Sequence, residues 1–401
     1  MIAPADLENG FGVVTTILLL IKLPTTAILL SRLFKGLTRS PLPTPQSPTP
    51  DMVGALSIVV PTLNEAQRIS PSLQGLTQQS YEDREIIVVD SRSTDGTQAL
   101  VKTVAERDPR FRLITDDPLP PGWVGRPWAL QTGFLKSSPK SDWIMGIDAD
   151  TQPQPKLAAT LLKFATEKNY DLISLSCRFI LKYPGELWLQ PALLITLVYR
   201  FGPPDIQVSR PEQIMANGQC FLCRRSVLEK LEGYTSARNS FCDDVTLARN
   251  AAAQGFNVGF LDGAQLLKVR MYDGFWDTWN GWGRSLDLKD ACSPAQLWSE
   301  LWFLLAVQGL PILILFIAFL LTLSEISLNP LFTGLIGLNG MLLAIRIGMN
   351  WAILPSYDFS QARSTGAFWL SPLADPLAVI RLFQSATQRS IQWRGKQYDR
   401  N

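Results

Sequence analysis

The middle of the chain alternates continuous apolar runs with amphipathic stretches and polar loops. Apolar runs of this length predict strands, and the amphipathic stretches between them predict helices. The predicted strands are Ser57–Val60, Glu85–Val89, Arg112–Ile114 and Trp143–Ile147, with helices near Ala66–Gln78 and Thr97–Arg107. Strands that alternate with helices form parallel sheets covered on both faces, so the pattern predicts an α/β fold with a mostly parallel sheet flanked by helices.

Both ends of the chain are more apolar than its middle. Phe11–Leu30 is about long enough to cross a bilayer, and Leu301–Leu323 and Leu331–Leu354 are two further candidate spans. Gly366–Phe383 is interrupted by prolines and charges, which favours an interfacial or re-entrant segment over a fourth crossing. Arg346, inside the third span, either has a function or faces a protein neighbour.

Charges beside these spans predict their orientation. Arg32, Lys35 and Arg39 follow the first span, whereas acidic residues precede it. Basic residues collect on the cytoplasmic side of a membrane, so we expect the amino terminus outside and the central domain in the cytoplasm. The loop 324–330 has no basic residue and the tail after it is basic, which predicts the same orientation. We therefore expect a multi-pass protein of the cell (inner) membrane.

Shifts in composition divide the chain into parts. Residues 1–40 are predicted to form an amino-terminal anchor and residues 41–54 a linker rich in proline, threonine and serine. Residues 55–295 form the central domain, and residues 296–401 form a transmembrane or interfacial region with a basic tail.

Composition restricts the chemistry that is available. The 37 basic and 35 acidic residues give a net charge of +2, so no global basic field argues for a nucleic-acid partner. The chain has no histidine, so a general base must be a carboxylate or another non-imidazole group, and a metal must be held by oxygen or thiolate. Cys220 and Cys223 form a single CxxC pair, which we interpret as strand core rather than as a metal or redox site.

Polar residues directly follow several of the predicted strands. Asn64 and Glu65 come after the first strand, Asp90 after the second, and the motif Asp148-Ala149-Asp150 after the strand that ends at Ile147. The carboxyl ends of parallel strands meet at one edge of a sheet, where such folds bind ligands. Two carboxylates at that edge can hold Mg²⁺ or Mn²⁺ against a diphosphate, so Asp148 and Asp150 are the candidate metal ligands.

In this combination and order, the motifs from about Leu56 to Lys289 resemble the family 2 glycosyltransferases with a GT-A fold. The resemblance implies a nucleotide-sugar donor, with Asp90 accepting hydrogen bonds from the base. Ser91 stands where many relatives have a second Asp. The implied donor-binding residues are Pro61, Asn64, Glu65, Asp90, Arg126 and Asp148.

Two further segments are similar to motifs of that family. Gly125–Gly133 resembles the segment Gly-Lys-x-x-Ala-Leu-x-x-Gly with Arg126 at the basic position, where an arginine could pair with the diphosphate. Asp243 and Asp244 stand where relatives carry Glu-Asp, which implies that Asp244 is the general base. Capping of the helix that begins there is the alternative for one of the two.

The acceptor side rests on the resemblance and on aromatic residues. Residues 216–225 resemble the strand beside the acceptor site of the family, and the stretch 275–285 is rich in tryptophan at helical spacing. The tryptophans suit either a membrane-interface face or a core stripe. The processive synthases carry Gln-x-x-Arg-Trp at this place, but here Gly281 and Ser285 replace its ends, which argues against polymer synthesis. The expected acceptor-binding residues are Gly218, Gln219, Trp279, Trp282 and Arg284.

Within the family, the late spans and the tail look most like the membrane enzymes that act on isoprenoid lipids, the carotenoid and hopanoid-associated glycosyltransferases. The resemblance therefore implies an inverting, metal-dependent enzyme that moves one sugar to a hydrophobic carotenoid-like acceptor. Two alternatives stay open: a lipid glycosyltransferase of the ceramide or dolichol type, and a non-enzymatic membrane scaffold on a transferase fold.

Overall fold

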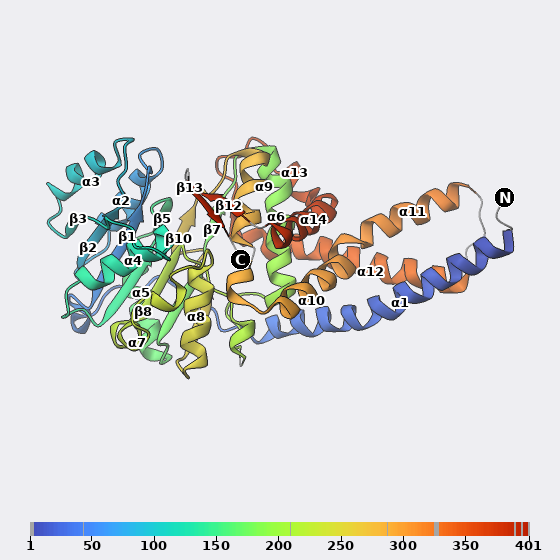
Figure 1. Ribbon diagram of the computed structural model, residues 1–401, viewed down its shortest axis with the longest axis horizontal. Coiled ribbons are helices and arrows are strands. Elements are labelled where there is room, and N and C mark those ends of the chain that lie inside the picture. The colour runs from blue at the N-terminus through green and yellow to red at the C-terminus, as the bar shows by residue number, and fades with distance from the viewer. Residues whose placement is uncertain are drawn as a thin grey trace.

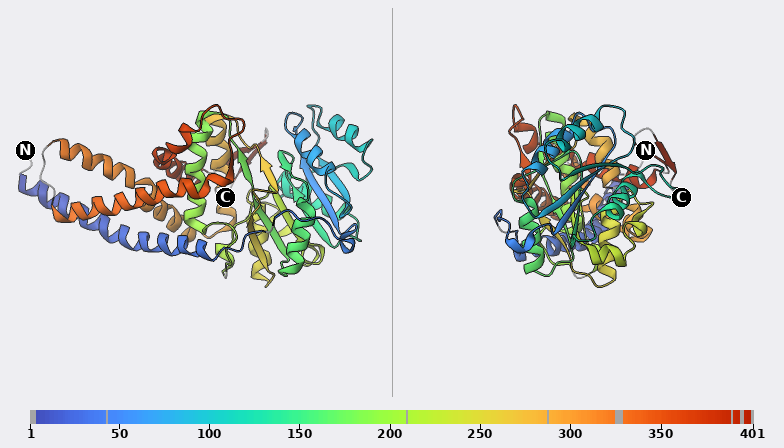
Figure 2. Two further views of the ribbon diagram at one scale, coloured as in Figure 1. Left: turned by 180° about the vertical axis from the view of Figure 1, so that it is seen from behind. Right: turned by 90° about the vertical axis from the view of Figure 1, so that its left-hand side faces the viewer.

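The computed structural model describes residues 4–42, 44–208, 210–286, 288–324, 329–388, 390–393 and 396–399. A layered α/β domain forms one end of the molecule, and long helices project from it toward the other end (Figures 1 and 2). A group of shorter helices lies between the two parts.

The main sheet has the strand order β3-β2-β1-β4-β8-β6-β9. The pairs β1–β2, β2–β3 and β1–β4 are parallel, whereas β8 runs antiparallel to both β4 and β6. The predicted parallel strands are confirmed, with β1, β2 and β3 longer than expected. The strands are β1 (Leu56–Thr62), β2 (Asp83–Asp90), β3 (Phe111–Thr115), β4 (Trp143–Ile147), β6 (Leu172–Ser176), β8 (Cys220–Arg224) and β9 (Val258–Asp262).

Helices cover both faces of this sheet, as its continuous apolar strands predicted. Along β1, Ile58 and Val60 belong to one core cluster and Val59 belongs to the cluster on the other face. Both faces therefore exclude water, which accounts for the lack of polar alternation in the strand. The helices of this part are α2 (Ile69–Thr77), α3 (Thr97–Ala105), α4 (Gly125–Lys136), α5 (Leu157–Glu167), α7 (Arg225–Lys230) and α8 (Asp243–Ala253).

A second sheet of short strands connects this domain to the helices behind it. Its order is β11-β7-β10-β5. Strand β5 starts directly after Asp150, and β11 follows the last long helix, so the sheet joins the Asp148–Asp150 motif to that helix. The Lys268 ammonium lies 2.7 Å from the Asp358 carboxylate across β10 and β11. The strands are β5 (Thr151–Pro153), β7 (Arg178–Ile180), β10 (Leu267–Val269) and β11 (Tyr357–Asp358).

Three long apolar segments project from the domain (Figure 1): α1 (Pro4–Phe34), α12 (Pro330–Ile353), and α10 (Pro294–Leu304) continued by α11 (Pro311–Leu323). Among the described residues, the helices at Gly12–Thr38 and Pro330–Ser356 are long and apolar enough to cross a membrane. The amino end of α1, the carboxyl end of α11 and the amino end of α12 lie together at the end far from the sheet (Figure 1).

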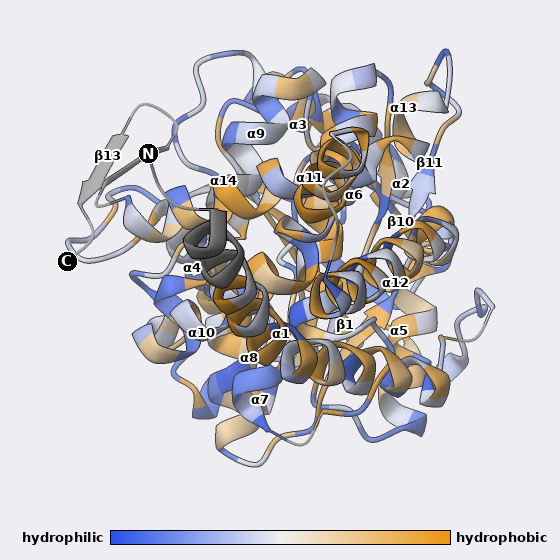
Figure 3. Ribbon diagram, turned by 90° about the vertical axis from the view of Figure 1, so that its right-hand side faces the viewer, coloured by the Kyte–Doolittle hydropathy of each residue, from blue (hydrophilic) through white to orange (hydrophobic). Residues whose placement is uncertain are grey.

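The candidate span Leu301–Leu323 is bent, and its crossing of a membrane stays a prediction. A π-helical turn, Leu305–Gly309, separates α10 from α11, and the two parts are bent by 41°. Pro311 lies at this break and has no N–H for the helical ladder, which favours a kink there. Apolar side chains of the long helices are exposed, among them Leu20, Phe316 and Trp351, as expected for contact with lipid. Figure 3 colours much of α11 and α12 as hydrophobic.

Polar side chains of the long helices point into the protein instead. Lys22 is fully buried and donates to the Ala306 carbonyl. Arg346 donates to the Asp375 carboxylate at 2.8 Å and to the Asn350 side chain at 2.6 Å. Of the two interpretations of Arg346, the structure therefore supports the one in which it faces a protein neighbour.

The remaining elements lie mostly between the sheet and the long helices. Gly366–Phe383 contains a break, as predicted: α13 and α14 are separated by a 3₁₀ turn at Ser371–Ala374. The helices are α6 (Pro184–Phe201), α9 (Gly274–Ser285), α13 (Gly366–Trp369) and α14 (Asp375–Thr387), and β12 (Ser390–Trp393) pairs with β13 (Lys396–Asp399) near the carboxyl end. Short 3₁₀ turns lie at Lys35–Thr38, Pro50–Met52, Pro211–Gln213, Thr235–Ala237, Lys289–Ala291 and Leu354–Ser356.

Candidate functional site

The predicted polar residues converge at the carboxyl edge of the parallel strands. Thr62 at the end of β1 pairs with Asp90, and Asp90 pairs in turn with Thr115 at the end of β3. Strand β8 is antiparallel, so Cys220 at its beginning pairs with Ile147 at the end of β4. Gly218 and Gln219 therefore come to the same edge as the Asp148–Asp150 motif, although they lie 70 residues further along the chain.

The loops after β1 and β2 are joined by hydrogen bonds. The Asn64 backbone N–H donates to the Ser93 hydroxyl at 2.8 Å, and the Asn64 side-chain oxygen accepts from the Thr94 N–H at 2.9 Å. Asn64 has a φ of 55°, a left-handed conformation that asparagine tolerates better than most residues. Together these bonds give the predicted donor-binding loop a fixed shape.

Asp95 stabilises the turn that leads into α3. Its carboxylate accepts hydrogen bonds from the Thr97 N–H at 3.0 Å and the Ala66 N–H at 2.9 Å. Glu65 is buried in the same loop, and its N–H donates to the Thr97 hydroxyl at 2.8 Å. Pro61 is half-buried near the end of β1.

The Asp90 carboxylate is only 1% exposed. It accepts hydrogen bonds from the Ser93 N–H at 2.9 Å, the Gln98 amide at 2.7 Å and the Thr62 hydroxyl at 3.3 Å. In this state Asp90 shapes the loop that follows β2. Its implied role toward the nucleotide base stays a prediction.

Asp116 is a residue at this edge that the sequence analysis missed. It is buried just after β3, and its carboxylate accepts a hydrogen bond from the Ser91 hydroxyl at 2.7 Å. Burial raises its pKa, which the bond from Ser91 opposes. Ser91 thus joins the end of β2 to the carboxylate that follows β3. The position directly after the third predicted strand was the signal that could have identified Asp116.

Arg126 connects three parts of the edge. Its Nε donates to Asp148 Oδ1 at 3.0 Å, its Nη2 donates to the Gly218 carbonyl at 2.6 Å, and its Nη1 donates to the Asp243 carboxylate. Arg126 lies in the first turn of α4, and Asp243 lies in the first turn of α8. A single guanidinium therefore ties the metal motif, the strand β8 and the helix α8 together.

For Arg126, Asp243 and Asp244, burial and the neighbouring opposite charges shift the pKa in opposite directions. Burial disfavours the Arg126 charge, but the carboxylates of Asp148, Asp243 and Asp244 outweigh it and raise the pKa of Arg126. Burial also raises the pKa of Asp243 and of Asp244, with Asp148 adding to the effect and Arg126 opposing it. The edge thus holds several carboxylates beside a cation that stays charged.

The two adjacent acids have different surroundings. Asp243 is buried in its ion pair with Arg126. Asp244 is half-buried, and its Oδ1 accepts a hydrogen bond from the Val245 N–H at 2.8 Å. Asp244 is therefore the more exposed residue of the two, while Asp243 is held inside the edge by Arg126.

The edge offers a divalent cation part of its ligand set. Asp148 is 28% exposed in its side chain and Asp150 is half-buried, and both offer hard oxygens that suit Mg²⁺ or Mn²⁺. In the part of the chain that the structure describes, no three His, Cys, Asp or Glu side chains are grouped to hold a metal. Cys177 is nearby, but burial raises the pKa of its thiol and keeps it neutral. The donor set thus fits a cation that takes its other ligands from phosphate and water.

Gly218 and Gln219 support Asp148 in this state. The Asp148 N–H donates to the Gln219 carbonyl at 3.2 Å, and the buried Gln219 side chain accepts from the Asn217 amide at 2.9 Å. Cys220 and Cys223 are buried core residues of β8 with free thiols, which confirms their interpretation as strand core.

The tryptophans of α9 do not form one membrane-facing stripe. Trp282 is 3% exposed and lies 5.8 Å from the Phe179 ring, so the membrane-interface interpretation is wrong for Trp282, which belongs to the core. Trp276 is 71% exposed, and Trp279 is half-buried with its ring 6.0 Å from Phe275. The side chain of Arg284 lies outside the described residues. Helical spacing alone could not separate these faces.

Exposed apolar side chains surround the junction of the domain with the long helices. They come from α9, α10, α12 and the segment from α13 to α14: Trp276, Trp298, Trp302, Trp351, Leu370, Leu373 and Ile380. Aromatic residues with one polar edge are common where proteins meet the interface of a bilayer.

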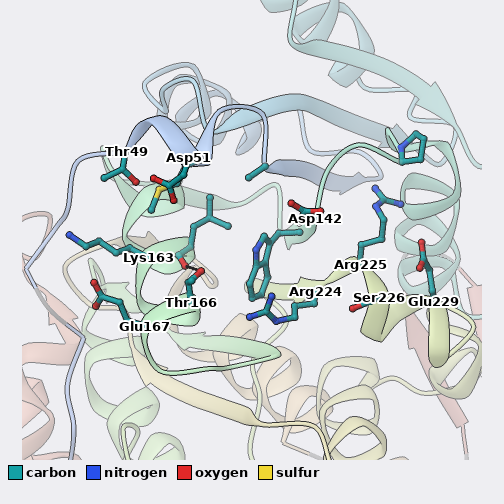
Figure 4. Close-up of a pocket in the computed structure, with 15 residues that line it drawn as sticks. Thr49, Asp51, Asp142, Lys163, Thr166, Glu167, Arg224, Arg225, Ser226 and Glu229 are labelled. Carbon is teal, nitrogen blue, oxygen red and sulfur yellow. Dashed lines mark hydrogen bonds between the residues drawn. The ribbon is translucent and has the colours of Figure 1, made fainter.

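A cleft of about 720 Å³ opens at the opposite edge of the sheet (Figure 4). Ala55 and Trp143, at the amino ends of β1 and β4, line it together with Lys163, Arg224 and Glu229. The carboxylates described above lie at the other end of these strands. The cleft is therefore separate from the candidate site.

Comparisons with known proteins agree with this geometry. Residues 57–232 match the family model for glycosyl transferase family 2. The 4,4'-diaponeurosporenoate glycosyltransferase of Staphylococcus haemolyticus is 25% identical over 235 residues, 58% of this chain and 61% of that protein. The uncharacterized glycosyltransferase YibD of Escherichia coli is 26% identical over 133 residues, 33% of this chain and 37% of that protein. The chain thus spans between about a third and two thirds of these relatives.

Among solved structures, the fold is similar to that of the mannosyltransferase PcManGT from Pyrobaculum calidifontis in complex with GDP-Man and Mn²⁺. The TM-score is 0.51 at 19% identity, and the match covers 84% of this chain and 99% of that one. The GT-A type of α/β fold, with a mostly parallel sheet flanked by helices, is thereby confirmed.

Proposed function

Residues 57–232 match the family model for glycosyl transferase family 2, and from this match we propose that the chain is a membrane-bound inverting glycosyltransferase. It transfers a single sugar from a nucleotide-sugar donor to a hydrophobic, carotenoid-like isoprenoid acceptor. The observation that supports the proposal best is the meeting of Arg126, Asp148, Asp243 and Asp244 at one sheet edge. These groups come from separate segments and provide both a diphosphate site and a base.

In the proposed reaction the acceptor hydroxyl attacks the anomeric carbon of the donor. The bond between that carbon and the diphosphate oxygen breaks as the new glycosidic bond forms on the opposite face, so the configuration inverts. Asp244 takes the hydroxyl proton, because it is the more exposed residue of the acid pair. The nucleoside diphosphate leaves from the edge that carries Asp148.

Asp148 and Asp150 would hold Mg²⁺ or Mn²⁺ through their oxygens. When bound, the cation supplies positive charge that stabilises the leaving diphosphate. Asn64, Glu65, Pro61 and Asp90 form the wall on which the nucleoside would lie. The structural neighbour with bound Mn²⁺ supports this assignment through its fold.

A hydrophobic acceptor is supported by the surroundings of the site. The strand β5 next to the metal motif shares a sheet with β11 at the end of α12, so the site is joined to a candidate membrane span. Exposed aromatic and aliphatic side chains surround the junction. The name of the Staphylococcus haemolyticus relative specifies a carotenoid acid as the acceptor of that protein. We propose an isoprenoid of the same carotenoid class here, one that carries the attacking hydroxyl, with Trp279 and Gly218 near the acceptor.

The orientation in the membrane is part of the proposal. Arg32 lies at the domain end of α1, and its guanidinium pairs with Glu300 at 2.8 Å beside the sheet domain. The amino end of α1 lies at the far end together with the α11 and α12 ends (Figure 1). This arrangement supports a cytoplasmic catalytic domain. A cysteine introduced near Ser324 should be labelled from outside intact cells, and labelling only after the membrane is opened would reverse the orientation.

The function is tested by lipid and pigment profiles of a deletion strain. We expect loss of a glycosylated isoprenoid and accumulation of its aglycone, with rescue by the wild-type gene and none by Asp150→Ala. If the deletion strain instead loses a glycosylated ceramide, dolichol-type lipid or hopanoid, the protein is still a glycosyltransferase but that lipid is its acceptor. Rescue by the Asp150→Ala variant would support the scaffold alternative.

A further inference from the structure

The Arg126 guanidinium donates hydrogen bonds to three groups of the protein. The guanidinium donates to Asp148 at 3.0 Å, to the Gly218 carbonyl at 2.6 Å and to Asp243. Its side chain is 17% exposed. A guanidinium has five N–H donors in a fixed plane, so three acceptors around it determine its position closely.

Gly218 makes room for this arrangement. A Cβ atom built on Gly218 would lie 2.5 Å from Arg126 Nη2 and 2.9 Å from its central carbon. These distances are shorter than real Cβ contacts, so an alanine at this position would displace the guanidinium. Glycine at position 218 is therefore a steric requirement for the contact between Arg126 and the β8 edge.

Arg126 and a bound cation would both contact the Asp148 carboxylate. One of its two carboxylate oxygens, Oδ1, accepts from Arg126, and both Nε and Nη2 lie 3.0 Å from that oxygen. A divalent cation that binds this carboxylate must share it with the guanidinium or displace it, because both carry positive charge. The same guanidinium holds Asp243 on α8, next to Asp244.

We propose that Arg126 is a positioning residue that competes with the divalent cation for Asp148 and holds Asp243, so that Asp244 is left as the base. The inference deepens the proposed function and rests on it for the role of Asp244. It differs from the expectation that Arg126 pairs with the donor diphosphate. Before the donor arrives, the guanidinium neutralises the carboxylates of the edge. After it arrives, Arg126 keeps α8 in place through Asp243.

The first test measures Mn²⁺ affinity by electron paramagnetic resonance, without nucleotide. Arg126→Met removes the competing charge while it keeps a long side chain, so Mn²⁺ should bind about three- to tenfold more tightly than to wild type. Arg126→Lys should fall between the two, because one ammonium cannot reach three acceptors. Asp148→Asn gives the reference for loss of the site.

The second test separates positioning from donor binding by kinetics. Arg126→Met should lower kcat by about 10- to 100-fold with the KM for the donor changed less than about threefold. Gly218→Ala should give the same pattern with the arginine charge intact. Gly337→Ala is the matched control: a Cβ there meets nothing within 4 Å, so its kinetics should equal those of wild type.

Other results of these two tests would contradict the proposal. If Arg126→Met leaves Mn²⁺ affinity unchanged and weakens nucleotide-sugar binding, Arg126 is a diphosphate ligand and the proposal is wrong. The same holds if Gly218→Ala keeps the wild-type kcat. If wild type transfers no sugar but Arg126→Met still tightens Mn²⁺ binding, the proposed function fails while the competition at Asp148 stands. Arg126→Lys and Gly218→Ala keep the test valid if Arg126→Met does not fold.

Discussion

Two carboxylates follow parallel strands of the same sheet, yet their surroundings differ. Asp90, the last residue of β2, is 1% exposed and accepts hydrogen bonds from Ser93 in the following loop and from Gln98 at the start of α3. Asp148, after β4, is 28% exposed and is bound by Arg126, which belongs to another helix. The first carboxylate maintains a local loop, whereas the position of the second depends on tertiary structure, and we propose that it exchanges its partner for a cation.

The largest effect is expected at the metal motif. Asp150→Ala should lower transfer by about 10³-fold or more, since the leaving diphosphate loses the stabilising cation. The variant should still fold and insert, because Asp150 lies half-buried in a turn. The measurement is transfer rate against Mg²⁺ or Mn²⁺ concentration with EDTA as reference. Full wild-type activity in excess EDTA would contradict the metal role.

The next effect concerns the base. Asp244→Asn keeps the size of the side chain but removes the proton acceptor, so the rate should fall by about 10²- to 10⁴-fold with near-normal nucleotide-sugar binding. Calorimetric binding together with single-turnover rates would separate the two steps. If Asp244→Asn transfers at nearly the wild-type rate while Asp243→Asn is inactive, the base is Asp243.

A smaller and gradual effect is expected on the decrease of the transfer rate at low pH. Asp244 must be deprotonated to act, and burial raises its pKa while Arg126 opposes the rise. The rate should therefore fall toward acid at a pH above the ordinary aspartate pKa of about 3.9. In Arg126→Met this decrease should move to higher pH, because the cation that favours the charged form is gone. A decrease near pH 4 that is the same in both proteins would be evidence against Asp244.

The smallest effect on chemistry is expected at Asp90. Asp90→Asn places an amide against the donors of Ser93 and Gln98, so stability should fall by about 1 to 3 kcal/mol and the KM for the donor should rise. The kcat should stay within about threefold of wild type. Thermal unfolding and donor titration would measure both. A large loss of kcat with unchanged KM would remove the distinction between the two carboxylates.

The difference between local and tertiary contacts also explains which features the sequence could predict. The strands β1 to β4, the polar loops after them and the core position of Cys220 follow from local patterns, and the structure confirms them. The contact between Arg126 and Asp243 joins residues 117 positions apart, so no local pattern contains it. Asp116 was missed for a related reason, because its role appears only when Ser91 is placed beside it.

In the apolar helices, too, the sequence predicted the segments but not the details that depend on packing. Hydropathy located the apolar segments, but the bend between α10 and α11 depends on the π-helical turn before Pro311. Helical spacing placed Trp276 and Trp282 in one helix, but which face each occupies depends on neighbouring elements such as Phe179. Packing partners that are distant in sequence decided both cases.

The central claim is that the carboxylate edge transfers sugar to a membrane-soluble acceptor. The most direct test is transfer of labelled sugar from UDP-, GDP- and dTDP-sugars into an organic-extractable carotenoid product by the purified full-length protein with Mn²⁺. We predict label in that product for wild type and none for Asp148→Asn at equal protein folding. Equal labelling by Asp148→Asn, or no organic-extractable label from wild type with any of these donors, would contradict the account.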